Sequence, residues 1–194
     1  MYKLNNMFMI LPLICMVVLP GCTSGLVIGG AVIAANSIKD PRSIGTQIDD
    51  KILETYISNA LSKNKDIKET TRITNTVYQG KVLLTGQAPN KKLAEQATQI
   101  SSKIKGSKKI YNEIRQAYPI PLEKIIIDLW ITTKIKIQIF IKNKTILSSI
   151  KIVTENKEVF LLGEITHQEE KTLINTIDNI HGIRNIITAF NYVS

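Results

Sequence analysis

Histidine and cysteine are scarce in this 194-residue sequence, which has two of each. A predicted helix separates His167 from His181, and neither lies in a His-Glu-x-x-His pattern, so a metal site is not expected. No serine, histidine and acid stand in a combination that indicates an activated nucleophile. The paired carboxylates Asp49-Asp50 and Glu169-Glu170 fit helix caps and surface positions better than an acid/base pair. We therefore expect a binding module without a cofactor.

Aromatic residues and arginine-rich runs are also lacking, whereas lysine is abundant. Aromatic residues make up 6% of the chain, and the formal net charge of +9 comes from lysines spread along the sequence. A basic protein of this kind can bind nucleic acid, anionic lipid or no specific partner. The cellular compartment decides among these, and the N-terminal sequence indicates it.

The first 22 residues have the pattern of a bacterial lipoprotein signal peptide. Lys3 precedes an apolar run that is too short for a comfortable membrane span. The run ends in Leu19-Pro20-Gly21-Cys22, which resembles a lipobox, where a small residue precedes the cysteine that receives the lipid. Cys15 follows an isoleucine and fits this pattern poorly. The alternative is an ordinary signal peptide or a single-span anchor.

We predict that residues 1–21 are removed and that Cys22 is acylated. Thr23 follows the cysteine, and the absence of Asp there favours the outer membrane under the enteric-type sorting rule. Residues 22–45 are predicted to form a lipidated tether, because Ser24–Asp40 is rich in glycine, alanine and apolar residues and has no helix caps. The mature chain then has no free thiol and no disulfide.

The rest of the chain repeats one order of predicted elements: helix, strand, strand, helix, strand. In residues 46–117 we expect these elements at 48–61, 71–77, 81–86, 91–104 and 110–115. A proline-bearing linker, 118–121, precedes the second copy in residues 122–194. There we expect elements at 130–141, 149–154, 158–162, 167–180 and 185–192, the second helix opening with a capping box of Thr166 and Glu169. Two tandem α+β units follow, which should pack together because one alone is marginal.

The segment 128–144, DLWITTKIKIQIFIKNK, is apolar in a way that one buried face does not explain. Part of it alternates like a strand, but as a helix it has two apolar stripes. The first stripe is aliphatic and suits a core: Ile131, Ile135 and Ile139. The second contains the only tryptophan of the chain: Trp130, Ile137 and Ile141, with Phe140 at its edge. The second stripe needs a partner outside the domain, and a membrane surface fits it.

The internal repeat supports this interpretation. Aligning Leu53 with Ile131, Ile57 with Ile135 and Leu61 with Ile139 brings the two core stripes into register. Three polar positions of the first helix then face three large apolar positions of the second: Asn59, Ser62 and Lys63 against Ile137, Phe140 and Ile141. Such side chains are a liability in water. Lys134 and Lys136 would lie beside anionic headgroups. The alternative is that the second stripe packs against the first unit.

Several motifs resemble known sequences. A V-x-L-x-G pattern ends the central hairpin in both copies, at Val82–Gly86 and Val159–Gly163, and resembles the BON domain. The sequences DPRSIGTQIDD, YQGKVLLTGQ, YNEIRQ, WITTK and EVFLLG resemble dual-BON outer-membrane lipoproteins over almost the whole mature chain. One departure is Lys157, where the family usually has glycine in the hairpin turn; Asn156 tolerates positive φ and can carry part of that turn.

The resemblance implies two tandem BON domains, each with helices packed on a small three-stranded mixed sheet. It also implies a lipoprotein that faces the periplasm, binds anionic phospholipid, particularly phosphatidylglycerol, is enriched at the division septum and supports envelope integrity. Trp130 and Phe140 fall on positions that the family uses for lipid contact. Helix geometry adds further expected lipid contacts: Lys134, Ile135, Lys136, Ile137 and Ile141.

The glycines Gly86 and Gly163 are expected to be structural, because a side chain there would crowd the returning helix or require an unfavourable φ. Two other functions remain open. One is a structural adaptor that binds an envelope or division-site protein, or peptidoglycan. The other is an enzyme acting on envelope material, which needs a partly buried carboxylate or histidine in a cleft, and the sequence offers no candidate. Nucleic acid and small-molecule substrates are not expected.

Overall fold

The computed structural model describes residues 42–193, which belong to one compact unit. The predicted signal peptide, Cys22 and most of the predicted tether lie outside the described residues. Within 42–193, no helix combines the length and the hydrophobicity that crossing a bilayer requires.

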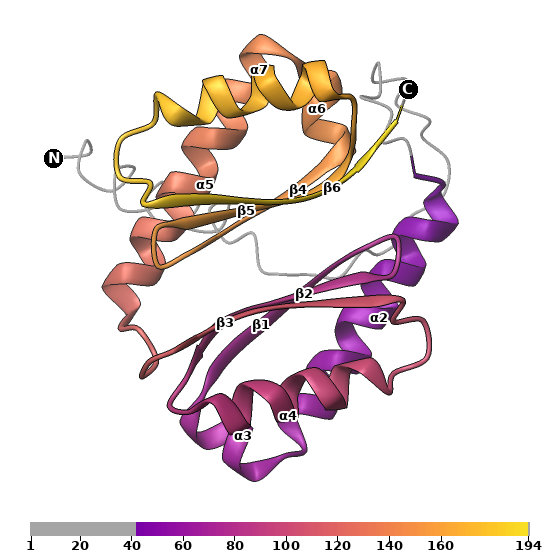
Figure 1. The fold of residues 1–194 in the computed structure, drawn as a ribbon, viewed down its shortest axis with the longest axis vertical. Coiled ribbons are helices and arrows are strands. Elements are labelled where there is room, and N and C mark those ends of the chain that lie inside the picture. Colours follow the sequence, from indigo (N-terminus) through magenta and orange to yellow (C-terminus); the bar gives the residue numbers. More distant parts are fainter. Residues whose placement is uncertain (1–41, 194) are drawn as a thin grey trace, which may run out of the picture. The chain divides into compact units, whose positions relative to one another are not determined.

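Domain 1 is a three-stranded mixed sheet with its helices on one face (Figure 1). Strands β1 and β2 are antiparallel, and β3 lies parallel to β2 on its other side. The turn between β1 and β2 consists of Gln79 and Gly80, both at positive φ, as a two-residue hairpin turn requires. The elements are α2 (Ile44–Ser62), α3 (Lys65–Thr70), β1 (Arg72–Tyr78), β2 (Lys81–Ala88), α4 (Lys91–Ser102) and β3 (Lys109–Gln116).

Domain 2 repeats this topology element by element (Figure 1). Its turn between the antiparallel strands consists of Asn156 and Lys157, again both at positive φ. The elements are α5 (Leu122–Lys142), α6 (Lys144–Ser149), β4 (Ile150–Glu155), β5 (Glu158–Ile165), α7 (His167–Asp178) and β6 (Asn185–Tyr192). The predicted α+β architecture with two mixed three-stranded sheets is confirmed.

Two helices were not predicted. Helices α3 and α6 replace the expected loops, and the side chains of Asn64 and Asn143 cap their N-termini. Each has six residues, which is too short for a periodic apolar pattern to show. Helix α5 also begins at Leu122 rather than at the predicted Trp130, because no residue after Pro121 interrupts the helix. The predicted capping box at the start of α7 is confirmed.

Each domain has its own core between the helices and one face of the sheet. In domain 1 the core contains Leu53, Ile57 and Leu61 of α2. In domain 2 it contains Ile131, Ile135 and Ile139 of α5. Both stripes predicted from helical periodicity are therefore buried as expected.

A third cluster joins the two domains through the opposite faces of the sheets. It contains Tyr78 and Leu83 from domain 1 with Phe160 and Leu162 from domain 2. Ion pairs surround this shared core: Arg72 with Glu155, Arg115 with Glu158 at 2.8 Å, and Lys151 with Glu54 at 2.7 Å. Strand β5 is therefore covered on both faces, which explains its continuous apolar run.

A buried aspartate fixes the hairpin turn in each domain. The carboxylate of Asp50 accepts hydrogen bonds from the backbone N–H groups of Gln79, at 2.8 Å, and Gly80, at 2.9 Å. Asp128 accepts the same pair of bonds from Asn156 and Lys157, at 2.7 and 2.8 Å. The interpretation of Asp50 as a cap or surface carboxylate is therefore wrong. Nothing local in the sequence reveals this role, because the partners lie in a distant turn.

Backbone at the start of the paired strand β1, or just before the paired strand β4, excludes a side chain at the glycines of the two V-x-L-x-G motifs; the returning helix does not. A Cβ on Gly86 would lie 1.8 Å from the carbonyl oxygen of Arg72, and φ at Gly86 is +119°. A Cβ on Gly163 would lie 2.4 Å from the carbonyl oxygen of Ser149. Both glycines lie inside their strands rather than at the ends. Their structural role stays as predicted, but the expected contact with the helix was wrong.

Candidate lipid-contact surface

Helix α5 has two apolar stripes. One packs in the core of domain 2 and the other is exposed to solvent. Trp130 is 60% exposed and Ile141 is 71% exposed, and Ile137 and Phe140 are also exposed. At about 100° per residue, Trp130, Ile137 and Ile141 lie on the side of the helix opposite the core stripe. We refer to the exposed apolar residues of α5 as the outer face.

The outer face is longer than the sequence indicated. Leu122, Ile126 and Leu129 are exposed too, and they extend the apolar surface by two turns toward the N-terminus. These residues were missed because the helix was predicted to start at Trp130. The apolar run Ile125–Ile127 could have indicated the longer outer face, since only part of this run can face the core.

One predicted contact residue does not belong to this surface. Ile135 is fully buried in the core of domain 2. It lies on the core stripe of α5, so it cannot reach a membrane without unfolding the domain. The prediction of Ile135 as a lipid contact is wrong.

Lysines flank the aromatic residues of the outer face. The ammonium of Lys134 lies 5.2 Å from the centre of the Trp130 ring, and that of Lys144 lies 4.6 Å from the centre of the Phe140 ring. Lys136 is also exposed. An aromatic ring next to an ammonium suits a membrane interface, where the ring enters the apolar region and the charge stays among headgroups. Lys144 was not predicted. The only exposed carboxylate of α5 is Glu123, in the first turn.

The outer face is not an inter-domain core. The shared core uses the sheet faces around Tyr78 and Phe160, and the residues of the outer face stay exposed in the presence of domain 1. The alternative in which the second stripe packs against the first unit is therefore contradicted.

Helix α2 of domain 1 provides an internal comparison. The alignment that matches the cores places Ile52 at the position of Trp130. Ile44, Ile48, Ile52 and Tyr56 are exposed, so α2 has an apolar strip over residues 44–56. After Tyr56 the helix presents the polar residues Asn59 and Ser62, and Lys63 is its C-cap. A continuous outer face with flanking lysines is a property of α5.

The polar groups of residues 42–193 do not form a metal site. The described residues contain no group of three or more His, Asp or Glu side chains that could hold a metal ion. His167 is exposed, as predicted, and its ring stacks on Tyr192 with centroids 3.9 Å apart. The pKa of the Tyr192 hydroxyl is raised by partial desolvation and by the adjacent Glu170 carboxylate, which leaves it protonated at neutral pH.

Comparison with known proteins assigns the family. The model of the BON domain matches residues 49–118 and 127–193, which are domains 1 and 2. The chain belongs to the BON domain family. The resemblance proposed from the hairpin motifs is therefore confirmed, and the two units are BON domain 1 and BON domain 2.

Two curated proteins are similar over most of the chain. The outer membrane lipoprotein DolP of Haemophilus influenzae is 37% identical over 175 residues, 90% of each chain. A protein of Actinobacillus pleuropneumoniae described as a 21 kDa hemolysin is 40% identical over 154 residues, 79% of each chain. The C-terminal domain of CdsD, from the type III secretion system of Chlamydia trachomatis, aligns with a TM-score of 0.30 at 15% identity, over 75% of this chain and 67% of that one. That likeness is too weak to support any argument.

Proposed function

We propose that this chain is an outer-membrane lipoprotein whose BON domain 2 binds anionic phospholipid through the outer face of α5. The observation that carries the proposal is the exposed stripe around Trp130, which no described part of the chain covers and which lysines flank. The role is that of a binding module rather than an enzyme.

The relatives support the location. The similarity to an outer membrane lipoprotein extends over 90% of the chain and agrees with the lipobox at Leu19–Cys22. We therefore propose acylation at Cys22, a periplasm-facing position, a preference for phosphatidylglycerol, enrichment at the division septum and a contribution to envelope integrity.

The energetics are adequate for a tethered domain. Each apolar side chain of the outer face is about half exposed, so its transfer into lipid contributes about 1 kcal/mol. Each flanking lysine adds about 1 kcal/mol near anionic headgroups. Acyl chains on Cys22 would keep the domain at an effective concentration of about 1 mM at the bilayer, so modest intrinsic affinity suffices.

Vesicle flotation with a chain that begins at Thr23, and so lacks the acylation site, tests the proposal. The wild-type chain should float with vesicles that contain phosphatidylglycerol and much less with phosphatidylcholine alone. Trp130→Glu should abolish flotation, because it places a negative charge against anionic lipid. The melting temperature should stay near the wild-type value, since Trp130 lies outside the core.

The matched control is Ile52→Glu, at the equivalent position of BON domain 1. It introduces the same charge on an exposed apolar residue and should reduce flotation far less than Trp130→Glu. Equal flotation of folded Trp130→Glu and wild type would place the lipid contact elsewhere. Absence of wild-type flotation would favour the adaptor function with a protein partner.

A further inference from the structure

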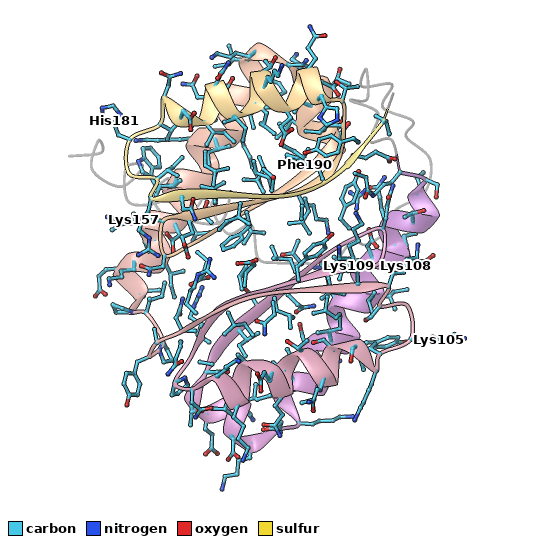
Figure 2. All side chains as sticks on the ribbon, in the orientation of Figure 1. Lys105, Lys108, Lys109, Lys157, His181 and Phe190 are labelled. Carbon is cyan, nitrogen blue, oxygen red and sulfur yellow. The ribbon has the colours of Figure 1, made fainter. Side chains whose placement is uncertain are left out.

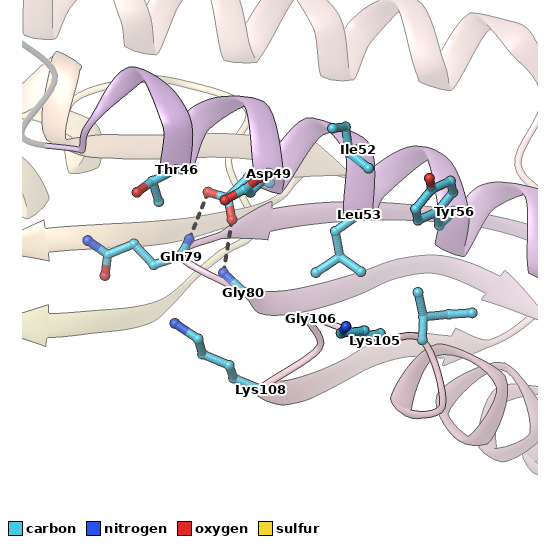
Figure 3. Close-up of a pocket in the computed structure, with 12 residues that line it drawn as sticks. Thr46, Asp49, Ile52, Leu53, Tyr56, Gln79, Gly80, Lys105, Gly106 and Lys108 are labelled. Atoms are coloured by element: carbon cyan, nitrogen blue, oxygen red, sulfur yellow. Dashed lines mark hydrogen bonds between the residues drawn. The ribbon is translucent and has the colours of Figure 1, made fainter.

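The internal repeat places a pocket at the same position in each BON domain. Each pocket lies between the first helix, the hairpin turn and the loop that follows the second long helix. In domain 1 the pocket has a volume of about 480 Å³, and residues of α2, the turn and the loop at Gly106 line it (Figure 3). In domain 2 the volume is about 270 Å³. The two pockets can therefore be compared position by position.

The charges of the two pockets differ. In domain 1 two lysines, Lys105 and Lys108, and two carboxylates, Asp49 and Asp50, line the pocket, and Asp50 is also paired with Arg42 at 2.9 Å. In domain 2, three cationic side chains line the smaller pocket with a single carboxylate. The residues are Lys124, Ile127, Asp128, Asn156, Lys157 and Arg184.

Three of the differences add positive charge or remove negative charge, whereas Lys105 has no counterpart among the residues that line the domain 2 pocket. By the alignment of the repeats, Lys124 replaces Thr46, Ile127 replaces Asp49, and Lys157 replaces Gly80. The remaining carboxylate, Asp128, is buried and accepts hydrogen bonds from the N–H groups of Asn156 and Lys157. Asp128 offsets one of the three cations, so the lining of this pocket keeps an excess of positive charge.

The backbone at Lys157 is unfavourable for a side chain. Its φ is +65°, whereas the equivalent residue of domain 1 is a glycine with φ +79°. A lysine in the left-handed region carries a conformational cost that glycine avoids, and such residues concentrate at functional sites. Lys157 is exposed at the β4–β5 turn (Figure 2).

Two of the three cations are available to a ligand. Among residues 42–193, neither Lys124 nor Lys157 has a carboxylate within ion-pairing distance. The guanidinium of the third, Arg184, lies 3.4 Å from a carboxylate oxygen of Glu158. The same oxygen binds the guanidinium of Arg115 at 2.8 Å. The backbone N–H of Arg184 donates to the carbonyl oxygen of Lys157 at 2.8 Å, which holds these two residues side by side.

The pocket adjoins the outer face of α5. Ile127 lines the pocket and is partly exposed, and it lies one helical turn from Trp130. A lipid whose acyl chains contact the outer face can therefore place its headgroup among the three cations. Ammonium and guanidinium donors suit phosphate oxygens.

We propose that the pocket formed by Lys124, Lys157 and Arg184 binds the phosphate of an anionic phospholipid. It selects anionic over zwitterionic lipid because the three cations repel the ammonium that a zwitterionic headgroup carries beside its phosphate. This inference rests on the proposed function, because it needs the outer face at a membrane. It adds the headgroup site, which meets the outer face at Ile127.

Lysine labelling tests the site in the mature protein held on vesicles. Acetylation of Lys124 and Lys157, followed by mass spectrometry, should slow about five-fold when phosphatidylglycerol is added to phosphatidylcholine vesicles. Lys105 and Lys108, in the equivalent pocket of domain 1, should change by less than about two-fold. Inorganic phosphate added to phosphatidylcholine vesicles should give little protection; protection equal to that of the lipid would assign the site to free phosphate and overturn the proposal.

Two double variants distinguish headgroup binding in the pocket from a general attraction between the positively charged protein and anionic lipid. Lys124→Gln with Lys157→Gly should weaken the preference for phosphatidylglycerol about twenty-fold, measured by the emission of Trp130, while binding through the outer face persists. The glycine restores the residue that domain 1 has in this turn, so folding should not suffer. The control, Lys105→Gln with Lys108→Gln, removes the same charge and should leave the preference unchanged.

The outcomes distinguish the two proposals. In the first case, Trp130 of the wild type enters lipid, but the two double variants keep or lose the preference for phosphatidylglycerol to the same extent. The pocket is then not the headgroup site, and the proposed function stands. If Trp130 of the wild type shows no change with lipid, the proposed function fails and this inference fails with it.

Discussion

Single residues of this chain show how an outward stripe differs from a core stripe. Ile135 and Ile137 lie two positions apart on α5, yet Ile135 is fully buried and Ile137 is 52% exposed. Both are isoleucines in an apolar run, so hydrophobicity alone does not separate them. Helical phase does, because residues two apart point to nearly opposite sides of a helix.

The glycine positions give a prediction at this scale. Gly86→Val should lower the free energy of unfolding by at least about 3 kcal/mol, because its Cβ would overlap the carbonyl of Arg72 and its φ is positive. Thermal or urea unfolding measures this loss. The control is Gly45→Ala on α2, where the nearest atom is 3.7 Å away and a stabilisation of about 0.5 kcal/mol is expected. An unchanged melting curve for Gly86→Val would contradict the structural role.

Helices and strands were largely predictable where periodicity was strong. The apolar spacing of α2 and α5, Asn90 as the N-cap of α4 and the capping box at Thr166 all gave correct elements. The short helices were not predictable because six residues are too few for a periodic pattern to show. The buried roles of Asp50 and Asp128 were not predictable because their partners lie in distant turns. In the candidate site, the alignment of the two repeats was enough to find the outer stripe of α5. The pocket at Lys157 could be found only from the structure.

The two first helices also give an element-scale prediction. Ile137→Asn, Phe140→Ser and Ile141→Lys together give α5 the residues that α2 has at these positions. The core stripe of α5 is untouched, so thermal unfolding should change little. Vesicle flotation should weaken by at least about ten-fold, since the C-terminal half of the outer face is lost. The same flotation as wild type would mean that this half does not contact lipid.

At the scale of the whole molecule, the two BON domains are held by an apolar cluster and by ion pairs with lowered carboxyl pKa values. Burial raises the pKa of Glu158, but the hydrogen bonds and charges of Arg115 and Arg184 outweigh it and hold the pKa below the ordinary 4.5. Burial likewise raises the pKa of Glu54, and the bonds from Lys151 and the Val77 N–H outweigh it. Both groups therefore favour the folded, docked state when ionised.

This arrangement predicts the direction of acid sensitivity. A carboxyl with a lowered folded-state pKa contributes its full stability above the unfolded value of about 4.5 and loses it as pH falls through the folded value. The melting temperature should therefore drop below pH 4.5. Glu158→Gln should flatten that drop, while Glu95→Gln, in an exposed pair with Lys91, should not. An equal effect of both variants would argue against the inter-domain pairs as the cause.

The central claim is that the outer face of α5 enters a membrane, and the single tryptophan of the chain reports on it directly. In the mature protein reconstituted in vesicles that contain phosphatidylglycerol, Trp130 emission should shift to the blue and lipids brominated on their acyl chains should quench it. In phosphatidylcholine vesicles, where the acyl anchor alone holds the protein, both effects should be much smaller. Emission that stays at its position in water, with no quenching by brominated phosphatidylglycerol, would contradict the account.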